Sequence, residues 1–274
     1  MVLSSGGIKP LAAIPLFEFL DRESIPVDLL VGCSGGSIMS ALRGFGCGTE
    51  EILAFFKRLE HSRILRHLDF RALLGLAGLP FGRFNMQSGL VKPGKLHTVL
   101  RETFGDCRIE DLKPKTLIQA TDVGTGEGVI LDRGLVREAV YASSALFPLL
   151  PPLQVDGRWL SDGYYTSPLP VAEAVKQQMD VIIAVLFYDP IDDNASSYIA
   201  CLSNYYTIQG DATTRYQMAL SIGIHDHEII IVKVPFRNPV NIWDAHYIPE
   251  IIELGRTAIE ARKRDILSAI AHFA

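Results

Sequence analysis

The chain has 274 residues, of which 48% are hydrophobic and 21% charged, and a net charge of −5 at pH 7. This composition is typical of a globular protein and excludes a disordered one, and the negative charge argues against nucleic acid as a partner. No apolar run reaches the roughly 18 residues of a membrane-spanning helix, and the N-terminus lacks the pattern of a secretory signal peptide, so we expect a cytoplasmic protein.

Two strand–turn–helix units follow each other at the N-terminus. Residues 2–4 indicate the end of a short strand, residues 5–9 a glycine-containing turn, and Pro10 the first position of a helix that runs to about residue 22. An apolar run at residues 27–31 predicts a second strand, which leads through Gly32-Cys33-Ser34-Gly35-Gly36 into a helix of small residues. In this setting a G-x-S-x-G pattern exposes the hydroxyl of Ser34 at the apex of a sharp turn.

The remaining elements alternate between helices and strands. Helices are predicted at about residues 49–59, 93–104, 135–143, 171–179 and 248–273, and strands at 115–121, 128–131, 153–155, 158–160, 180–187 and 228–234. This alternation favours an α/β fold with a mainly parallel sheet, and Asp156-Gly157 predicts a tight hairpin turn. Because we find no linker or internal repeat, we expect one domain over residues 1–274, with an insert at about 60–92.

The insert lies in a basic part of the sequence. Between Lys57 and Arg101 there are nine basic residues and two acidic ones, and residues 70–84 are apolar, rich in glycine and framed by Arg71 and Arg83. Such a cluster is usually a solvated helix face. An apolar face beside cations is also what contact with anionic phospholipid requires, and a loop and helix buried against the core is the third interpretation.

Ser34 has the surroundings of a nucleophile. Gly35 offers a backbone N–H just past it, and the turn Gly6-Gly7-Ile8 can offer more if the first two strands are neighbours, so together they form a candidate oxyanion hole. Lys9 would add positive potential. A glycine turn before a helix can also hold a phosphate, but residues 5–10 lack the P-loop and dinucleotide-binding spacings, which favours acyl transfer over nucleotide binding.

The base that would activate Ser34 is open between two kinds of residue. A Ser–His–Asp arrangement would use His225, His227, His246 or His272, although Ser34 comes earlier in the chain than such a fold usually allows. The alternative is a carboxylate acting directly, for which Asp162-Gly163 is the candidate. We interpret His225 and His227 as surface polar residues and expect no metal or cofactor, since the cysteines (Cys33, Cys47, Cys107 and Cys201) also lack metal spacing.

These motifs together resemble the patatin-like phospholipase family. The resemblance rests on Gly6-Gly7-Ile8-Lys9, the pentapeptide around Ser34, the stretch 142–148, and Asp162-Gly163 followed by residues 167–170, and it covers most of residues 1–190. It implies a three-layer α/β/α fold with a mainly parallel central sheet. Ser5 and Pro10 stand where the family's glycine-rich motif usually has glycines, and Tyr164 stands where a small residue is common.

The resemblance implies a lipid acyl hydrolase that works without a metal. Ser34 would be the nucleophile and Asp162 the base, with Gly6, Gly7, Ile8 and Gly35 at the oxyanion hole and Lys9, Gly32, Gly36 and Gly163 in support. The expected substrate is a phospholipid or lysophospholipid, reached by a cytoplasmic protein through peripheral contact with an anionic membrane, and we expect the apolar residues 70–84 to hold the acyl chain. A Ser–His–Asp esterase or thioesterase, an acyltransferase, and a catalytically idle lipid-binding protein are the alternatives.

Overall fold

A computed structural model describes residues 1–64, 67–225, 228–237, 240 and 245–273. The strands within them are β1 (Val2–Leu3), β2 (Leu29–Cys33), β3 (Lys115–Asp122), β4 (Gly128–Leu131), β5 (Leu153–Val155), β6 (Arg158–Asp162), β7 (Val181–Tyr188) and β8 (Glu228–Pro235). They form one sheet in the order β5-β6-β3-β2-β1-β7-β8, with β4 paired to β3. The pairs among β3, β2, β1, β7 and β8 are parallel, and those that involve β4, β5 or β6 are antiparallel. The prediction of a mostly parallel sheet is confirmed.

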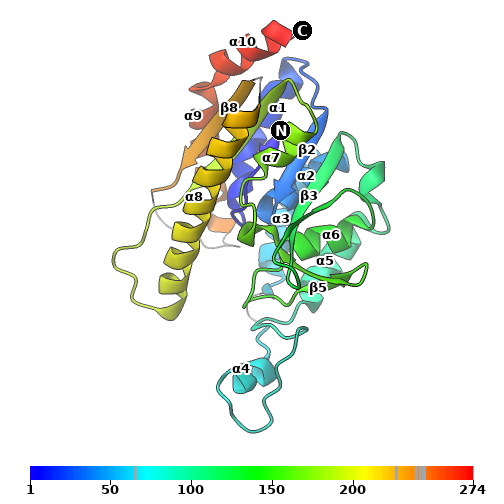
Figure 1. Ribbon diagram of the computed structural model, residues 1–274, viewed down its shortest axis with the longest axis vertical. Coiled ribbons are helices and arrows are strands. Elements are labelled where there is room, and N and C mark those ends of the chain that lie inside the picture. The colour runs from blue at the N-terminus through cyan, green and yellow to red at the C-terminus, as the bar shows by residue number, and fades with distance from the viewer. Residues whose placement is uncertain (65–66, 226–227, 238–239, 241–244, 274) are drawn as a thin grey trace.

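Helices cover both faces of this sheet (Figure 1). They are α1 (Ile14–Arg22), α2 (Gly35–Gly44), α3 (Thr49–His61), α4 (Phe70–Leu76), α5 (Gly94–Phe104), α6 (Val136–Ser143), α7 (Val171–Lys176), α8 (Tyr198–Ile224), α9 (Ile248–Glu260) and α10 (Lys263–Phe273). Short 3₁₀ turns occur at Lys9–Ala13, Ile109–Asp111, Gly163–Tyr165 and Ala245–Tyr247.

Alternate residues of the central strands supply the two layers of the core. Leu3, Leu30 and Ile118 point toward the larger layer, which holds the apolar faces of α1, α2, α3, α5, α6 and α9. Their neighbours Val2 and Val31 belong to a second layer with residues of α7 and α8. Because side chains in a strand alternate between faces, the near-continuous apolar runs of the sequence fit strands that are covered on both sides. The three-layer α/β/α fold expected from the sequence is therefore confirmed.

Local sequence signals explain several element boundaries. Pro10 lies in the first turn of the Lys9–Ala13 3₁₀ helix, and Glu51 accepts a hydrogen bond from the N–H of Gly48 at the start of α3 (2.9 Å). Asp156 and Gly157 both adopt positive φ angles, 48° and 79°, between the antiparallel strands β5 and β6. This is the conformation that a two-residue hairpin turn needs, so the predicted turn is correct.

Two helical predictions differ from the structure. The predicted helix at 248–273 is interrupted at Ala261 and Arg262, so that it forms α9 and α10. The 27-residue helix α8 is absent from the predicted elements, although it crosses one face of the sheet (Figure 1). Even this helix falls short of what a membrane span requires, as does every other helix in the described parts of the chain.

The insert projects from the body of the protein. In Figure 1, α4 lies at the lower end of the molecule, away from the sheet. Asp69 begins α4, because its carboxylate accepts hydrogen bonds from the N–H groups of Arg71 and Ala72. Large apolar side chains of the insert are exposed to solvent, with Phe81 91% exposed. The interpretation of this segment as a loop and helix buried against the core is therefore wrong.

Candidate active site

Ser34 occupies the sharp turn between β2 and α2. Its backbone has φ 52° and ψ −121°, a combination that residues with side chains rarely adopt and that costs on the order of 1–3 kcal/mol. The turn places Ser34 at the carboxyl end of a parallel strand, where open α/β sheets bind ligands. The expected strand–turn–helix around Ser34 is thus present, strained at the one residue whose side chain must project.

Asp162 lies two strands away from Ser34, at the end of β6. In β3, Gln119 is in register with Cys33 of β2, and Ala120 is in register with Asp162. This pairing brings the Ser34 hydroxyl within hydrogen-bond distance of the carboxylate, with 2.8 Å between Oγ of Ser34 and Oδ2 of Asp162. The other carboxylate oxygen, Oδ1, accepts a hydrogen bond from the N–H of Tyr164 (2.9 Å). Both oxygens therefore have one donor each.

Burial changes the acid strength of this carboxyl group. Asp162 is 1% exposed, and its removal from water raises the pKa of the carboxyl from 3.8 to about 7. The N–H of Tyr164 and the Ser34 hydroxyl lower the pKa in part, since each donates to the charged form. A carboxylate with a pKa near neutrality can accept a proton and return it at physiological pH, as a general base must.

Ser143, which the sequence analysis did not single out, holds the strained turn. Its Oγ accepts a hydrogen bond from the N–H of Ser34 (2.9 Å) and donates one to the carbonyl of Gln119 (2.6 Å). Ser143 is the last residue of α6 and is fully buried. It lies in the stretch 142–148 that carries part of the family resemblance, and this was the signal in the sequence that could have identified it.

The two glycine turns touch through their backbones. A Cβ atom placed on Gly35 would lie 2.0 Å from the carbonyl oxygen of Gly7, a distance that no real side chain tolerates. Gly7 itself has φ +58°, which favours glycine. The structure therefore brings the loop after β1 and the start of α2 together, as the prediction that β1 and β2 are neighbours requires.

The candidate oxyanion donors are only partly gathered at the cavity. Gly6 and Gly7 line it together with Ser34, whereas Ile8 and Gly35 are buried and do not belong to its lining. In the hydrogen bonds described for the chain, the N–H groups of Gly6 and Gly7 have no acceptor. Gly32 and Gly36 pack at the base of the turn, and Gly163 follows Asp162 in close contact with the Gln119 carbonyl.

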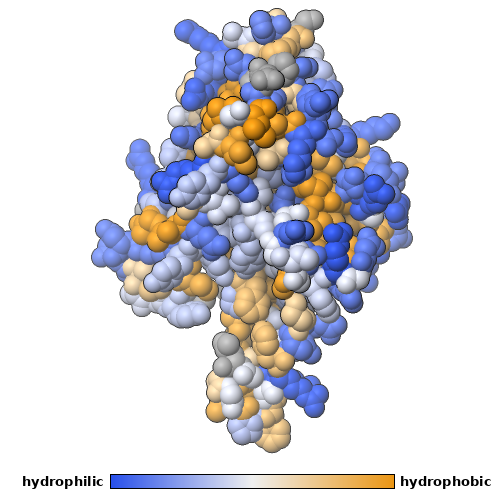
Figure 2. Space-filling view, in the orientation of Figure 1, coloured by the Kyte–Doolittle hydropathy of each residue, from blue (hydrophilic) through white to orange (hydrophobic). Residues whose placement is uncertain are grey.

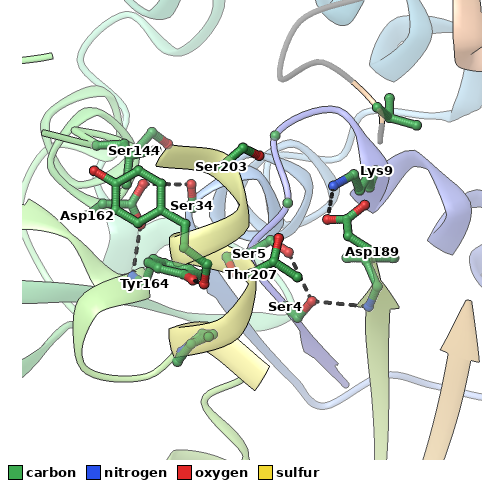
Figure 3. Close-up of a pocket in the computed structure, with 18 of the residues that line it drawn as sticks. Ser4, Ser5, Lys9, Ser34, Ser144, Asp162, Tyr164, Asp189, Ser203 and Thr207 are labelled. Carbon is green, nitrogen blue, oxygen red and sulfur yellow. Dashed lines mark hydrogen bonds and ion pairs between the residues drawn. The ribbon is translucent and has the colours of Figure 1, made fainter. Parts of the chain in front are cut away.

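Lys9 lines the same cavity but carries a compensated charge. Its Nζ forms an ion pair with the carboxylate of Asp189 and lies 5.7 Å from the centroid of the Phe236 ring. The free positive potential expected from Lys9 is therefore offset by Asp189, which the sequence analysis did not identify. Figure 3 shows the Ser34–Asp162 pair at one side of the cavity and the Lys9–Asp189 pair at the other.

The cavity has a volume of about 180 Å³ and a mixed lining. Its apolar wall includes Ile64, Leu146, Leu149 and Leu150, and α8 contributes polar groups such as Ser203 and Thr207, both labelled in Figure 3. None of the described side chains of residues 70–84 belongs to this lining. The expectation that they hold the acyl chain is wrong for this cavity, because the insert that contains them projects away from the sheet.

Hydrogen bonds hold helix α8 over the site, and several of them come from the residues that follow Asp162 in the chain. The hydroxyl of Tyr164 donates to the backbone carbonyl of Tyr206, and Gln217 donates to the carbonyl of Thr166 (2.5 Å). The hydroxyls of Tyr165 and Tyr206 both donate to the carbonyl of Phe147 (2.8 and 2.6 Å). Tyr164, the departure from the family pattern, thus anchors the helix that forms one wall.

No histidine lines the cavity within the described residues. His225, His246 and His272 lie outside its lining, and His227 falls outside the part of the chain that the structure describes. No cluster of three or more metal-ligating side chains occurs among the residues with described positions. The polar neighbour of the Ser34 hydroxyl is a carboxylate.

A serine on a strained strand–turn–helix in a mostly parallel sheet defines the class of α/β proteins with a nucleophile elbow. The sequence also matches a model of the patatin-like phospholipase family over residues 1–175. Because this match covers more than half of the 274 residues, the chain belongs to the patatin-like phospholipase family. The family identified from the motifs of the sequence is thereby confirmed.

The individual proteins that the chain resembles share less than a third of its residues over the aligned regions. The chain is 29% identical to an uncharacterised NTE family protein of Mycobacterium tuberculosis, over 68% of this chain and 48% of that protein. It is 29% identical to lysophospholipase NTE1 of Meyerozyma guilliermondii, over 76% of this chain and 14% of that protein. The chain thus spans about half or less of the length of these relatives. The crystal structure of VipD from Legionella pneumophila aligns with a TM-score of 0.49 at 10% identity, over 94% of this chain and 65% of that one, a likeness too weak for a functional conclusion.

Proposed function

We propose that the protein is a serine acyl hydrolase that cleaves fatty acyl esters of phospholipids or lysophospholipids through Ser34 and Asp162. The observation that carries this proposal is the 2.8 Å contact between the Ser34 hydroxyl and a buried carboxylate in a cavity without a described histidine. Membership in the patatin-like phospholipase family and similarity to a protein named lysophospholipase support the lipid substrate.

Acylation begins with the ionised Asp162. Its Oδ2 accepts the proton of the Ser34 hydroxyl while Oγ attacks the ester carbonyl of the lipid. The resulting tetrahedral intermediate carries a negative charge on the former carbonyl oxygen. Asp162, now protonated, gives its proton to the leaving alcohol as the ester bond breaks, and the acyl group remains on Ser34. A water molecule then attacks this acyl-enzyme with Asp162 again as the base, which releases the fatty acid and restores the serine.

The oxyanion donors proposed for this mechanism are the backbone N–H groups of the glycine turns. Gly6 and Gly7 line the cavity beside Ser34 with N–H groups that have no described acceptor, so they are available to a substrate oxygen. Gly35 and Ile8 are the further candidates, and the N-terminus of α2 adds the positive end of a helix dipole. Donors of this kind are typically worth about 100-fold or more in rate each.

Substitutions at the two side chains test the proposal directly. Ser34→Ala removes the nucleophile, and Asp162→Asn keeps the size of the side chain while it removes the base. We expect each to lower the release of fatty acid from phosphatidylcholine, phosphatidylglycerol and their lyso forms by about 1,000-fold or more. Circular dichroism and thermal unfolding serve as the control that both variants fold.

Two results would overturn the dyad. One is an Asp162→Asn variant with activity close to wild type. The other is a loss as large as that of Ser34→Ala when His225, His227, His246 or His272 is replaced by alanine, which would favour a Ser–His–Asp esterase. Failure of a fluorophosphonate to label Ser34 in the wild type would instead indicate a catalytically idle lipid-binding protein.

A further inference from the structure

The insert forms a distinct lobe with a narrow neck. We call residues 67–92 the α4 lobe. At its base the chain runs out and back as an antiparallel pair: Leu68 bridges to Val91, and the N–H of Asp69 donates to the carbonyl of Leu90 (2.9 Å). The lobe lies at one end of the molecule (Figure 1), so its outer surface is not covered by the sheet or by the helices that flank it.

Large apolar side chains cover the outside of the lobe. The exposed ones are Leu68, Phe70, Leu79, Phe81, Phe84 and Met86. Phe81 and Phe70 are 91% and 70% exposed, which is unusual for phenylalanine in a protein that also has a well-filled core. Figure 2 shows orange apolar atoms at the lower end of the molecule, where α4 lies in Figure 1, next to blue hydrophilic atoms. Several large apolar side chains exposed on one projecting segment indicate an interaction site.

The charge of the lobe is opposite to that of the whole chain. It contains three basic residues, Arg71, Arg83 and Lys92, and one acidic residue, Asp69, in a protein of net charge −5. All three basic side chains are exposed, and none belongs to an ion pair between described residues. The Asp69 carboxylate is occupied as the N-cap of α4. The lobe therefore presents unpaired cations among exposed aromatic rings.

We propose that the α4 lobe docks on the surface of a bilayer that contains anionic phospholipid. The rings of Phe70 and Phe81 enter the boundary between head groups and acyl chains, and Arg71 and Arg83 remain at the level of the phosphates. Apolar side chains beside cations are what interfacial binding requires, and the two contributions add. A bilayer is flat and extended, so it can receive a projecting lobe without a complementary pocket.

The lobe is joined to the wall of the active-site cavity. The N–H groups of Leu90 and Val91 donate to the carbonyls of Pro148 and Leu149 (2.8 and 2.9 Å), and Leu149 lines the cavity. The rings of Phe84 and Phe147 also meet edge to face, with centroids 6.1 Å apart. A docked lobe would therefore hold the apolar rim of the cavity beside the membrane. This second step rests on the proposed lipid hydrolysis, whereas membrane binding by itself does not.

A second copy of the chain fits this surface less well. In a symmetric dimer the same patch meets itself, so the Arg71 and Arg83 side chains of both copies would gather in one desolvated contact. Like charges across an interface disfavour association. Anionic head groups would instead neutralise these cations. The unpaired positive charge of the lobe therefore favours a bilayer over a second copy of the chain.

Vesicle binding by the Ser34→Ala protein tests the docking without any hydrolysis. Co-sedimentation of the protein is measured with two kinds of vesicle. One contains phosphatidylcholine alone, and the other contains equal amounts of phosphatidylcholine and phosphatidylglycerol. We expect binding to the anionic vesicles to fall about tenfold or more in Phe70→Ser/Phe81→Ser, and about fivefold for each cation removed in Arg71→Gln/Arg83→Gln. The matched control is Leu220→Ser/Ile224→Ser, which removes exposed apolar side chains of α8 and should bind like the parent protein.

The same lobe variants made with Ser34 intact separate this inference from the proposed function. Hydrolysis of a short-chain ester dissolved as monomers should stay within about twofold of wild type, while hydrolysis of anionic vesicles falls with binding. Unchanged vesicle binding in the lobe variants, equal binding to both kinds of vesicle, or an equal loss in the α8 control would overturn the proposal. So would gel filtration that shows a dimer converted to a monomer by Phe70→Ser/Phe81→Ser without an effect on vesicle binding. Absence of activity in all proteins with binding as expected would contradict only the hydrolase.

Discussion

The surroundings of Ser34 and the α4 lobe are built in opposite ways. Around Ser34, backbone packs on backbone, the carboxylate of Asp162 is buried, and the N–H and hydroxyl of Ser34 each have a defined partner. In the α4 lobe, aromatic side chains are exposed and the cations have no described partner. The arrangement around Ser34 depends on close contacts between particular atoms, whereas the surface of the lobe depends on which types of residue it exposes. Substitutions should therefore act steeply near Ser34 and gently in the lobe.

The largest effect should come from a single methyl group at Gly35. In Gly35→Ala the new Cβ would meet the carbonyl oxygen of Gly7 at 2.0 Å, so the two glycine turns must separate. We expect hydrolysis to fall about 1,000-fold or more, since both the nucleophile and the proposed oxyanion donors move. Gly94→Ala is the matched control, because nothing lies within 4 Å of its Cβ position at the start of α5. Near-normal activity of Gly35→Ala would mean that the contact is softer than its geometry indicates.

A smaller effect should follow from pH. In the proposed mechanism Asp162 must be ionised to accept the Ser34 proton, and burial raises its pKa to about 7. The fraction of active enzyme therefore falls as the pH drops, and kcat/KM for a soluble ester should decrease about tenfold per unit below pH 7 and level off above it. The lobe has no part in this profile, so Phe70→Ser/Phe81→Ser should show the same curve. A rate that stays constant down to pH 5 would contradict a base with this pKa.

Two adjacent serines provide a more subtle comparison. Ser143→Ala removes the acceptor of the Ser34 N–H and leaves that group buried without a partner, which should destabilise the protein by about 1–3 kcal/mol and lower kcat. Ser144→Ala removes a buried hydroxyl that has no partner among the described residues, so its free energy of unfolding should change little. Urea unfolding monitored by circular dichroism measures both. Equal losses in the two variants would show that the hydroxyl of Ser143 does not hold the turn.

The smallest effect on stability should come from the lobe. Phe81→Ser replaces a ring that is 91% exposed, and its free energy of unfolding should stay within about 0.5 kcal/mol of wild type. Phe55→Ala, at a fully buried position of α3, should cost about 3–5 kcal/mol. The same measurement applied to both phenylalanines defines the boundary between core and lobe. A large loss for Phe81→Ser would indicate that its ring is packed.

Much of the fold could be predicted because its signals are local. The apolar strands, the Asp156-Gly157 turn and the turn around Ser34 each depend on a few neighbouring residues. Helix α8 was not predicted because its apolar side chains lie on both sides: Met218 is buried, whereas Tyr216 and Leu220 are exposed. The break between α9 and α10 leaves no trace in the pattern, since Ile259 and Ile266 are both buried and keep a helical spacing across it.

The site was only partly predictable for a related reason. Ser34 and Asp162 could be identified from motifs, and their proximity was expected from the family resemblance. The ion pair between Lys9 and Asp189 joins residues 180 positions apart, and no local pattern indicates such a pairing. The sequence also did not determine that residues 70–84 face outward. An apolar segment has the same sequence pattern whether it packs on the core or is exposed to a membrane.

The pairing of three strands has a consequence for how this site can vary. Cys33 is matched with Gln119, and the next residue along β3, Ala120, is matched with Asp162, so the 2.8 Å contact is set by two rows of backbone hydrogen bonds. Neighbouring residues of a strand face opposite sides of the sheet. One extra residue within β6 would therefore turn the carboxylate away from the serine, although both residues were still present in the sequence. Loops around the sheet can lengthen during evolution, whereas the register of β6 against β3 cannot shift by one residue without separating Asp162 from Ser34.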